Sequence, residues 1–131
     1  MAKKTETNYK VTIESVSKEL TAKERIQLKD LSDAQRLDKL TQVEPVFINV
    51  AFYATLSVHN EKADDKDYKN YVVVAKDGTR YVTGSSSFIT AFENIMDEIS
   101  DSGEEIELVV KVYRLPSKNR EGKDFITCSL A

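Results

Sequence analysis

The stretch Tyr71–Phe88, YVVVAKDGTRYVTGSSSF, contains a strand, a tight turn, a second strand and the start of a helix without a gap. Its Asp77-Gly78 pair predicts a β-hairpin, because both residue types tolerate the positive φ of a two-residue type I′ turn. Such a turn fixes the register of the two strands. The expected cross-strand pairs are Ala75 with Arg80, Val74 with Tyr81, Val73 with Val82, and Val72 with Thr83.

The two faces of this hairpin follow from the alternation of side chains along a strand. One face carries Tyr71, Val73, Ala75, Arg80 and Val82, and the other carries Val72, Val74, Lys76, Thr79, Tyr81 and Thr83. Aliphatic side chains occur on both faces, so both compete for a place in the core. We expect Val72 and Val74 to be buried, and Tyr71 and Arg80 to line an open groove.

A helix is predicted to follow the hairpin. Three serines after Gly84 supply an N-cap, and apolar residues then recur with the spacing of one helix face. Gly103 is the residue type that ends helices in left-handed geometry. The apolar positions are Phe88, Ile89, Phe92, Ile95, Met96 and Ile99.

The segment before the hairpin, VFINVAFYATLSVH from Val46 to His59, alternates as a strand does. Val46, Ile48, Val50, Phe52, Ala54, Leu56 and Val58 share the expected core face. Phe47, Asn49, Ala51, Tyr53, Thr55, Ser57 and His59 share a half-polar face with two aromatics. Nearer the N-terminus, Tyr9 begins another alternating strand. Thr21 and Glu24 have capping-box spacing, which predicts a helix over Ala22–Thr41, although Ile26 and Leu28 also fit a strand.

Two further strands are predicted after the helix. Their inward positions are Ile106, Leu108, Val110 and Val112 in the first, and Ile126, Cys128 and Leu130 in the second. The chain is therefore mainly β, and we expect a five-stranded oligonucleotide-binding barrel with one helix between strands three and four. Residues 1–44 form a strand and helix extension packed on it, and residues 1–131 form a single domain.

Composition excludes several classes of protein. A chain of 131 residues with 40% apolar and 31% charged residues has ordinary globular composition. No apolar run reaches the ~18 residues of a membrane span, and no signal peptide is evident, so we expect a cytoplasmic protein of a bacterial host cell. Cys128 has no partner cysteine and is expected to be a small core residue.

Catalytic motifs are missing from the sequence. It has one histidine and one cysteine, and it lacks GxSxG, HExxH and GxxxxGK[ST]. We therefore expect no enzyme activity, no cofactor and no metal site.

Charge is distributed unevenly despite a net charge of −3. Seven acidic and no basic residues lie between Glu93 and Glu107, whereas five basic residues lie between Lys111 and Lys123. Proteins that bind single strands stack bases on aromatic side chains while basic side chains follow the backbone. The predicted binding residues are Phe47, Tyr53, Lys69, Tyr71 (or Tyr81), Arg80, Lys111, Tyr113, Arg114, Lys118, Arg120, Lys123 and Phe125.

Four segments together resemble phage and prophage single-stranded DNA-binding proteins of Gram-positive hosts. They are TIESVSKELTAKERIQLKD, NVAFYATLSVHNE, NYVVVAKDGTRYVTGSSSFITAFENI and LPSKNREGKDFITCSL, which span nearly the whole chain. The resemblance implies an oligonucleotide-binding fold that coats single-stranded DNA during phage DNA replication or recombination. It also implies phage or host replication and recombination proteins as partners.

The acidic run from Glu93 to Glu107 leaves an alternative function open. A phage inhibitor could use it to mimic nucleic acid and occupy a basic surface of a host protein. The sequence also leaves open whether the protein is a monomer or a homodimer, how many nucleotides it covers and whether it prefers any base.

Overall fold

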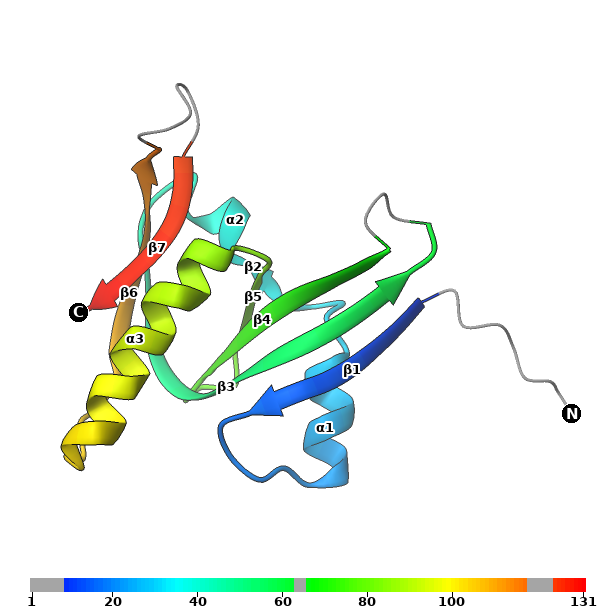
Figure 1. Ribbon diagram of the computed structural model, residues 1–131, viewed down its shortest axis with the longest axis horizontal. Coiled ribbons are helices and arrows are strands. Elements are labelled where there is room, and N and C mark those ends of the chain that lie inside the picture. Colours follow the sequence, from blue (N-terminus) through cyan, green and yellow to red (C-terminus); the bar gives the residue numbers. More distant parts are fainter. Residues whose placement is uncertain (1–8, 63–65, 118–123) are drawn as a thin grey trace, which may run out of the picture.

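The computed structural model describes residues 9–62, 66–117 and 124–131. These residues form a mostly β structure with few helices, in which the sheet curls into a half-barrel consistent with an oligonucleotide-binding type of fold (Figure 1). The elements in chain order are β1 (Tyr9–Val16), α1 (Ala22–Lys29), β2 (Gln35–Arg36), α2 (Leu37–Leu40), β3 (Val46–Asn60), β4 (Asp67–Ala75), β5 (Arg80–Thr83), α3 (Ser86–Ser102), β6 (Val109–Pro116) and β7 (Asp124–Leu130).

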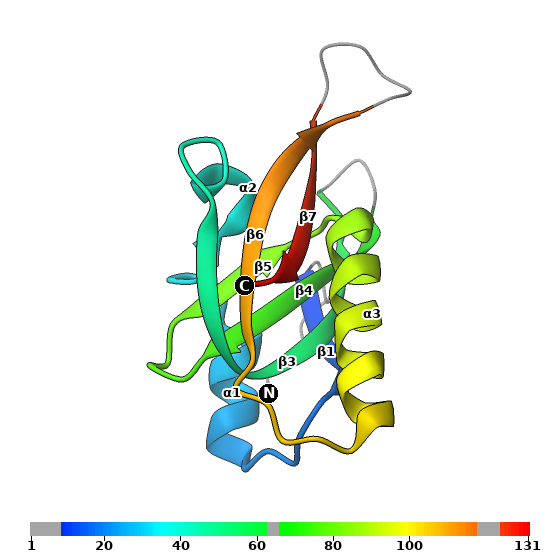
Figure 2. The ribbon, with the colours of Figure 1, turned by 90° about the vertical axis from the view of Figure 1, so that its left-hand side faces the viewer.

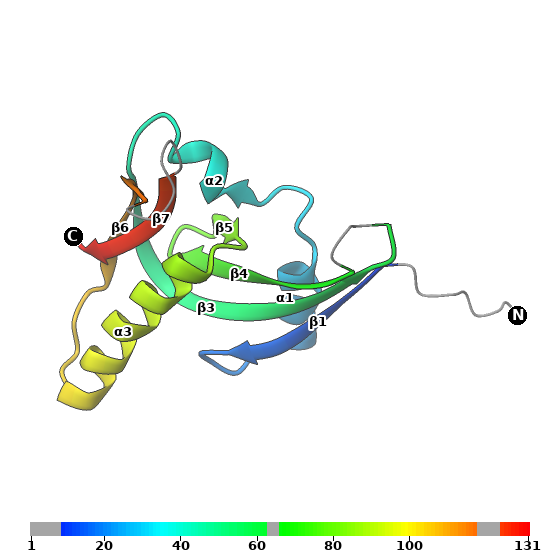
Figure 3. The same ribbon diagram turned by 45° about the horizontal axis from the view of Figure 1, so that its top comes forward.

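Strand β3 is the central strand of the sheet. The strand order is β2-β5-β4-β3-β6-β7, and β1 also pairs with β3. The first part of β3, Val46–Asn49, pairs with β6, whereas its later part pairs with both β4 and β1. Figure 3 shows β3 curving from the β6 and β7 pair into the long ribbon of β4 and β1.

A bulge in β3 changes which side chains face each side of the sheet. The register with β4 shifts between Val50 and Phe52, so Ala51 is an extra residue in the ladder. Val50 packs in the core on the α3 side, but Phe52 packs on the opposite side of the sheet. The prediction of a single core face from Val46 to Val58 is therefore wrong beyond Val50.

The hairpin between β4 and β5 has a three-residue turn. The backbone N–H of Ala75 donates to Thr79 O at 2.8 Å, and the N–H of Gly78 donates to Ala75 O at 2.9 Å. Gly78 has a φ of 93°, whereas Asp77 has a negative φ and its Oδ1 accepts from the N–H of Thr79. This is the geometry of a type I turn followed by a left-handed glycine.

The prediction of a two-residue turn is therefore wrong, and the predicted pairing of the two strands is shifted by one residue. The observed pairs are Tyr71 with Thr83, Val72 with Val82, Val73 with Tyr81, and Val74 with Arg80. Arg80 consequently shares a face with Val72 and Val74. It does not lie beside Tyr71, as the predicted groove requires.

Two hydrophobic clusters lie on opposite sides of the sheet, one towards α3 and the other towards α1. Figure 2 shows these two helices on either side of the strands. The α3-side core contains Leu37, Ile48, Val50, Val73, Ala75, Phe88, Ile89, Phe92, Leu108, Val110, Val112, Ile126 and Cys128. The α1-side core contains Val11, Leu28, Ala54, Leu56, Val58, Val72, Val74 and Val82. The expected inward residues Ile106 and Leu130 are instead 43% and 50% exposed, because Ile106 precedes β6 and Leu130 ends β7.

The long helix predicted over Ala22–Thr41 consists of two shorter helices. The Thr21–Glu24 capping box is confirmed at the start of α1. The helix ends at Asp30, whose carboxylate accepts hydrogen bonds from the N–H and hydroxyl of Ser32. Such a local turn competes with helical hydrogen bonding, so the chain leaves the helix there.

The short helix α2 joins the two halves of the sheet. Its Leu37 is fully buried in the α3-side core. Asp38 accepts a hydrogen bond from the Thr83 hydroxyl of β5 at 2.6 Å. Arg114 of β6 donates to Asp38 O at 2.6 Å and to Thr41 Oγ1 at 3.1 Å. The serine cap and Gly103 terminus predicted for α3 are both confirmed.

The turn glycine gives a stability prediction. We expect Gly78→Ala to lower the free energy of unfolding by about 1 to 2 kcal/mol, because an alanine is strained at positive φ. Gly84→Ala is the matched control, since a Cβ there meets Lys69 O at an ordinary 3.6 Å. Urea unfolding measures both variants. Equal losses in the two variants would contradict this account of the turn.

Candidate nucleic-acid interface

An exposed aromatic surface covers the outside of β3, β6 and β7. Val110, Val112 and Ile126 point into the α3-side core, so their alternating neighbours point away from it. Phe47 lies opposite Lys111, and Leu115 lies opposite Phe125. We call Phe47, Lys111, Tyr113, Leu115 and Phe125 the outer aromatic face.

One ring of this face, that of Phe47, is largely exposed. Phe47 is 59% exposed and Leu115 is 40% exposed. Tyr113 and Phe125 are half-buried.

A lysine supplies positive charge within the same surface. The Nζ of Lys111 lies 5.4 Å from the centre of the Tyr113 ring, a cation–π contact. Within the described part of the chain, no carboxylate lies within ion-pair distance of this ammonium group. Its charge is therefore available for a phosphate group.

The two ends of the outer aromatic face differ in charge. At one end Asn49 donates to the Glu107 carboxylate at 3.1 Å. At the other end, β6 and β7 are joined by a segment that is basic in sequence. Its predicted binding residues Lys118, Arg120 and Lys123 lie outside the described residues.

Two other predicted residues, Tyr53 and Tyr71, pack on the α3 side of the sheet. The ring of Tyr53 meets Phe92 edge to face, with centres 4.8 Å apart. Burial, and then the nearby Glu93 and Asp97, raise the pKa of the Tyr53 phenol. Tyr71 is also half-buried against the α3-side core. Tyr53 thus has a packing role and an acidic neighbourhood.

Lys69 is already paired with a carboxylate. Its Nζ lies 3.0 Å from Glu14 Oε2, and the hydrogen bond to Glu14 raises the pKa of the lysine. The lysine is half-exposed, so this pair contributes little stability and a phosphate could replace Glu14.

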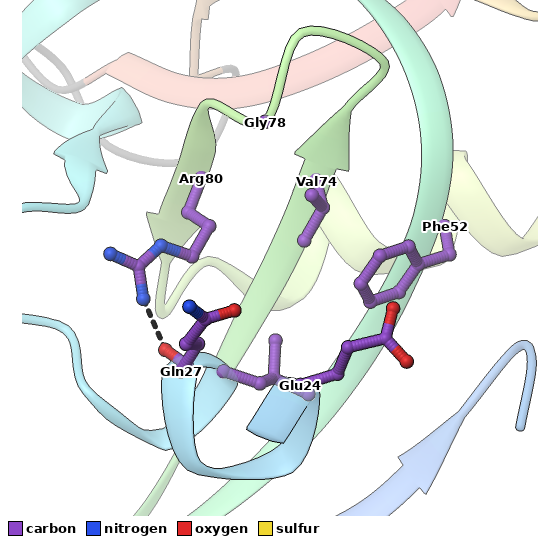
Figure 4. A pocket seen from close by; sticks show the side chains of 7 residues that line it. Glu24, Gln27, Phe52, Val74, Gly78 and Arg80 are labelled. Carbon is purple, nitrogen blue, oxygen red and sulfur yellow. Dashed lines mark hydrogen bonds between the residues drawn. The ribbon is translucent and has the colours of Figure 1, made fainter. Parts of the chain in front are cut away.

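Arg80 is bound within the protein. Figure 4 shows its guanidinium directed from β5 towards Gln27 of α1. It donates to Gln27 O, to Asp30 O at 2.7 Å and to the Asp33 carboxylate, and only 18% of its side chain is exposed. Arg114 is similarly engaged with Asp38 O and Thr41. These two guanidinium groups hold the segment from α1 to α2 against the sheet.

Sequence reasoning missed Leu115 in the outer aromatic face. The last inward position expected for this strand is Val112, so its predicted outer face ends at Tyr113. In the structure β6 continues to Pro116. Continuing the alternation by one more pair of residues would have found Leu115.

Exposed aromatic side chains interleaved with a lysine on a curled β-sheet are typical of proteins that bind single-stranded nucleic acid. The family model "Phage Single-stranded DNA-binding protein", of the phi29 type, matches residues 6–131. The chain therefore belongs to this family of phage single-stranded DNA-binding proteins, as the resemblance of its sequence indicates. Comparisons with curated proteins and with solved structures gave no match. No helix in the described residues has the length and apolar character to cross a membrane.

The contacts of Arg114 predict a structural effect of its removal. We expect Arg114→Ala to lower the free energy of unfolding by about 1 to 3 kcal/mol, because two acceptors on α2 lose a charged donor. Chemical unfolding measures this loss. A variant with unchanged stability but much weaker binding of single-stranded DNA would show instead that this guanidinium contacts DNA.

Proposed function

We propose that this protein coats and protects single-stranded DNA without sequence preference during phage DNA replication and recombination. The observation that carries the proposal is the outer aromatic face, where Lys111 lies beside Tyr113 and Phe47 is largely exposed. Aromatic rings stack on every base and a lysine binds any phosphate, so neither contact depends on sequence.

The proposed architecture is a five-stranded oligonucleotide-binding core. We take β3, β4, β5, β6 and β7 as its strands, with α3 between the third and fourth. Residues 1–44 are then an extension on a single domain. The contacts of Arg80 with Gln27, Asp30 and Asp33 support this packing.

The proposed contact residues fall into two groups. Phe47, Tyr113 and Phe125 stack bases, while Lys111 binds phosphate. Lys118, Arg120 and Lys123 would extend the phosphate contacts, on the basis of their charge in the sequence. Tyr53, Lys69 and Tyr71 form a second group on the α3 side of the sheet. Arg80 and Arg114 would reach DNA only by giving up their hydrogen bonds within the protein.

The partners implied by this role are single-stranded DNA and the replication or recombination proteins of the phage or its Gram-positive host. Both a monomer and a homodimer fit the proposal.

A titration with labelled oligothymidine and with duplex DNA at two salt concentrations tests the function. We expect tight binding to the single strand alone, weakened by salt because each phosphate contact releases about 0.7 counterions. The absence of binding to both nucleic acids would contradict the proposal and favour the inhibitor that acts through Glu93–Glu107.

Two substitutions test the outer aromatic face. We expect Phe47→Ala and Tyr113→Ala each to weaken oligothymidine binding by about 1 to 3 kcal/mol, because each removes a stacking surface. Ile26→Ala is the matched control, since Ile26 is a 70% exposed apolar residue on α1. Fluorescence anisotropy measures affinity, and urea unfolding confirms that the variants are folded. Affinities equal to that of Ile26→Ala would contradict the assignment of this face.

A further inference from the structure

A hollow of about 690 Å³ lies where the segment before β3 passes the β4–β5 hairpin. The lining residues that determine its chemistry are Gln35, Lys39, Glu44, Phe47, Thr79 and Tyr81. Its volume is in the range of sites that hold small ligands, about 300 to 1,000 Å³.

The hollow exists because two neighbouring strands diverge. Strand β3 pairs with β4 from Val50 onward, and the N–H of Lys76 still donates to Asn49 O at 2.9 Å. Before Asn49, β3 pairs with β6 on its other edge while the hairpin turns away towards Thr79. The segment from α2 to Pro45 lines the space left between them.

The lining combines two aromatic rings with polar groups. Phe47 comes from β3 and Tyr81 comes from β5, so the rings approach from different strands. Gln35 and Thr79 supply an amide and a hydroxyl, which suit the hydrogen-bonding edge of a nucleobase. Lys39 and Glu44 supply one charge of each sign, and Lys39 has no ion pair among the residues that the structure describes.

The hollow is continuous with the outer aromatic face. Phe47 belongs to both, since it lines the hollow and lies opposite Lys111 of β6. Val43, at 85% the most exposed large apolar residue described, lines the hollow as well. A DNA strand bound along the outer face would therefore pass the mouth of this hollow.

We propose that this hollow is a subsite for one nucleobase of the bound single strand, with Tyr81 as its stacking residue and Lys39 holding the adjoining phosphate. The proposal rests on the function proposed above. It adds a base site whose lining residues come from outside β6 and β7. Because a ring face and an adaptable amide recognise all four bases, the subsite fits binding without sequence preference.

A second hollow, of about 330 Å³ between α1 and the hairpin, also has an aromatic ring and an amide, from Phe52 and Gln27, but its cation is engaged within the protein (Figure 4). It is lined by Glu24 and Phe52, and its cation is Arg80, whose donors already bind Gln27 O, Asp30 O and Asp33. Lys39 can bind a phosphate without giving up an ion pair within the described residues, whereas Arg80 would have to give up its hydrogen bonds. This difference favours the hollow at Tyr81 as the base site.

A pair of charge substitutions in the full chain tests the subsite. We expect Val43→Glu to weaken oligothymidine binding by about fivefold or more, because a carboxylate at the mouth repels the adjoining phosphate. Ile26→Glu is the matched control, since it adds the same charge at an exposed apolar residue outside the hollow. We expect Ile26→Glu to bind as the unsubstituted protein does.

A second pair of variants tests the ring. We expect Tyr81→Leu to weaken binding about tenfold and Tyr81→Phe to retain it, because stacking needs the ring and not the hydroxyl. Photocross-linking with an oligothymidine that carries 5-iododeoxyuridine, followed by mass spectrometry, should place a cross-link on Tyr81, which is not part of the outer aromatic face. This readout uses the unsubstituted protein, so it does not depend on the stability of any variant.

The outcomes separate this inference from the proposed function. Normal affinity of Val43→Glu, together with cross-links confined to Phe47, Tyr113 and Phe125, would overturn the subsite and leave the coating function standing. Absence of oligothymidine binding by the unsubstituted protein would overturn both.

Discussion

The bulge at Ala51 is the constraint on which the arrangement of this protein depends. A strand that kept strict alternation from Val46 to Val58 would place all its large aliphatic side chains on one side of the sheet. The extra residue lets Val50 pack towards α3 and Leu56 pack towards α1. Both cores therefore form on one continuous strand, and the N-terminal segment gains an apolar surface on which to fold.

Burial of both faces of β4 follows from this arrangement. Val72 and Val74 lie in the α1-side core, and Val73 and Ala75 lie in the α3-side core. An uninterrupted apolar run is typical of a strand that is covered on both sides. The two faces that compete for the core in the sequence are therefore both buried, because α1 covers one face and α3 covers the other. A consequence is that the outside of β4 and β5 is closed by α1 and Arg80, which leaves the outside of β6 and β7 exposed.

Elements with strong local signals could be predicted from the sequence, but their registers could not. Helix caps depend only on residues that are close in sequence, so they can be recognised there. The structure has the predicted caps at Thr21, at the serines that begin α3 and at Gly103. The Asp77-Gly78 turn is also local, but type I′ and three-residue turns share this residue pair and differ by one position in register. Because of this difference of one position, Arg80 lies on the α1 side of the sheet.

In the candidate site, the alternation of side chains correctly predicts that Lys111 and Tyr113 lie on the same side of β6. The hydrogen bond from Arg114 to Asp38 O of α2 is a tertiary contact, and no local sequence pattern predicts it.

The separation of charge explains how a protein with a net charge of −3 suits a polyanionic ligand. Acidic residues of α3 lie near Tyr53, where they and burial raise the pKa of the phenol. They oppose phosphate on that side of the sheet, while Lys111 presents an available ammonium on the other. Lys39 supplies a second ammonium group, at the hollow beside Tyr81. In the binding mode proposed above, the DNA strand would therefore contact chiefly β3 and β6, with its phosphates away from the acidic residues of α3.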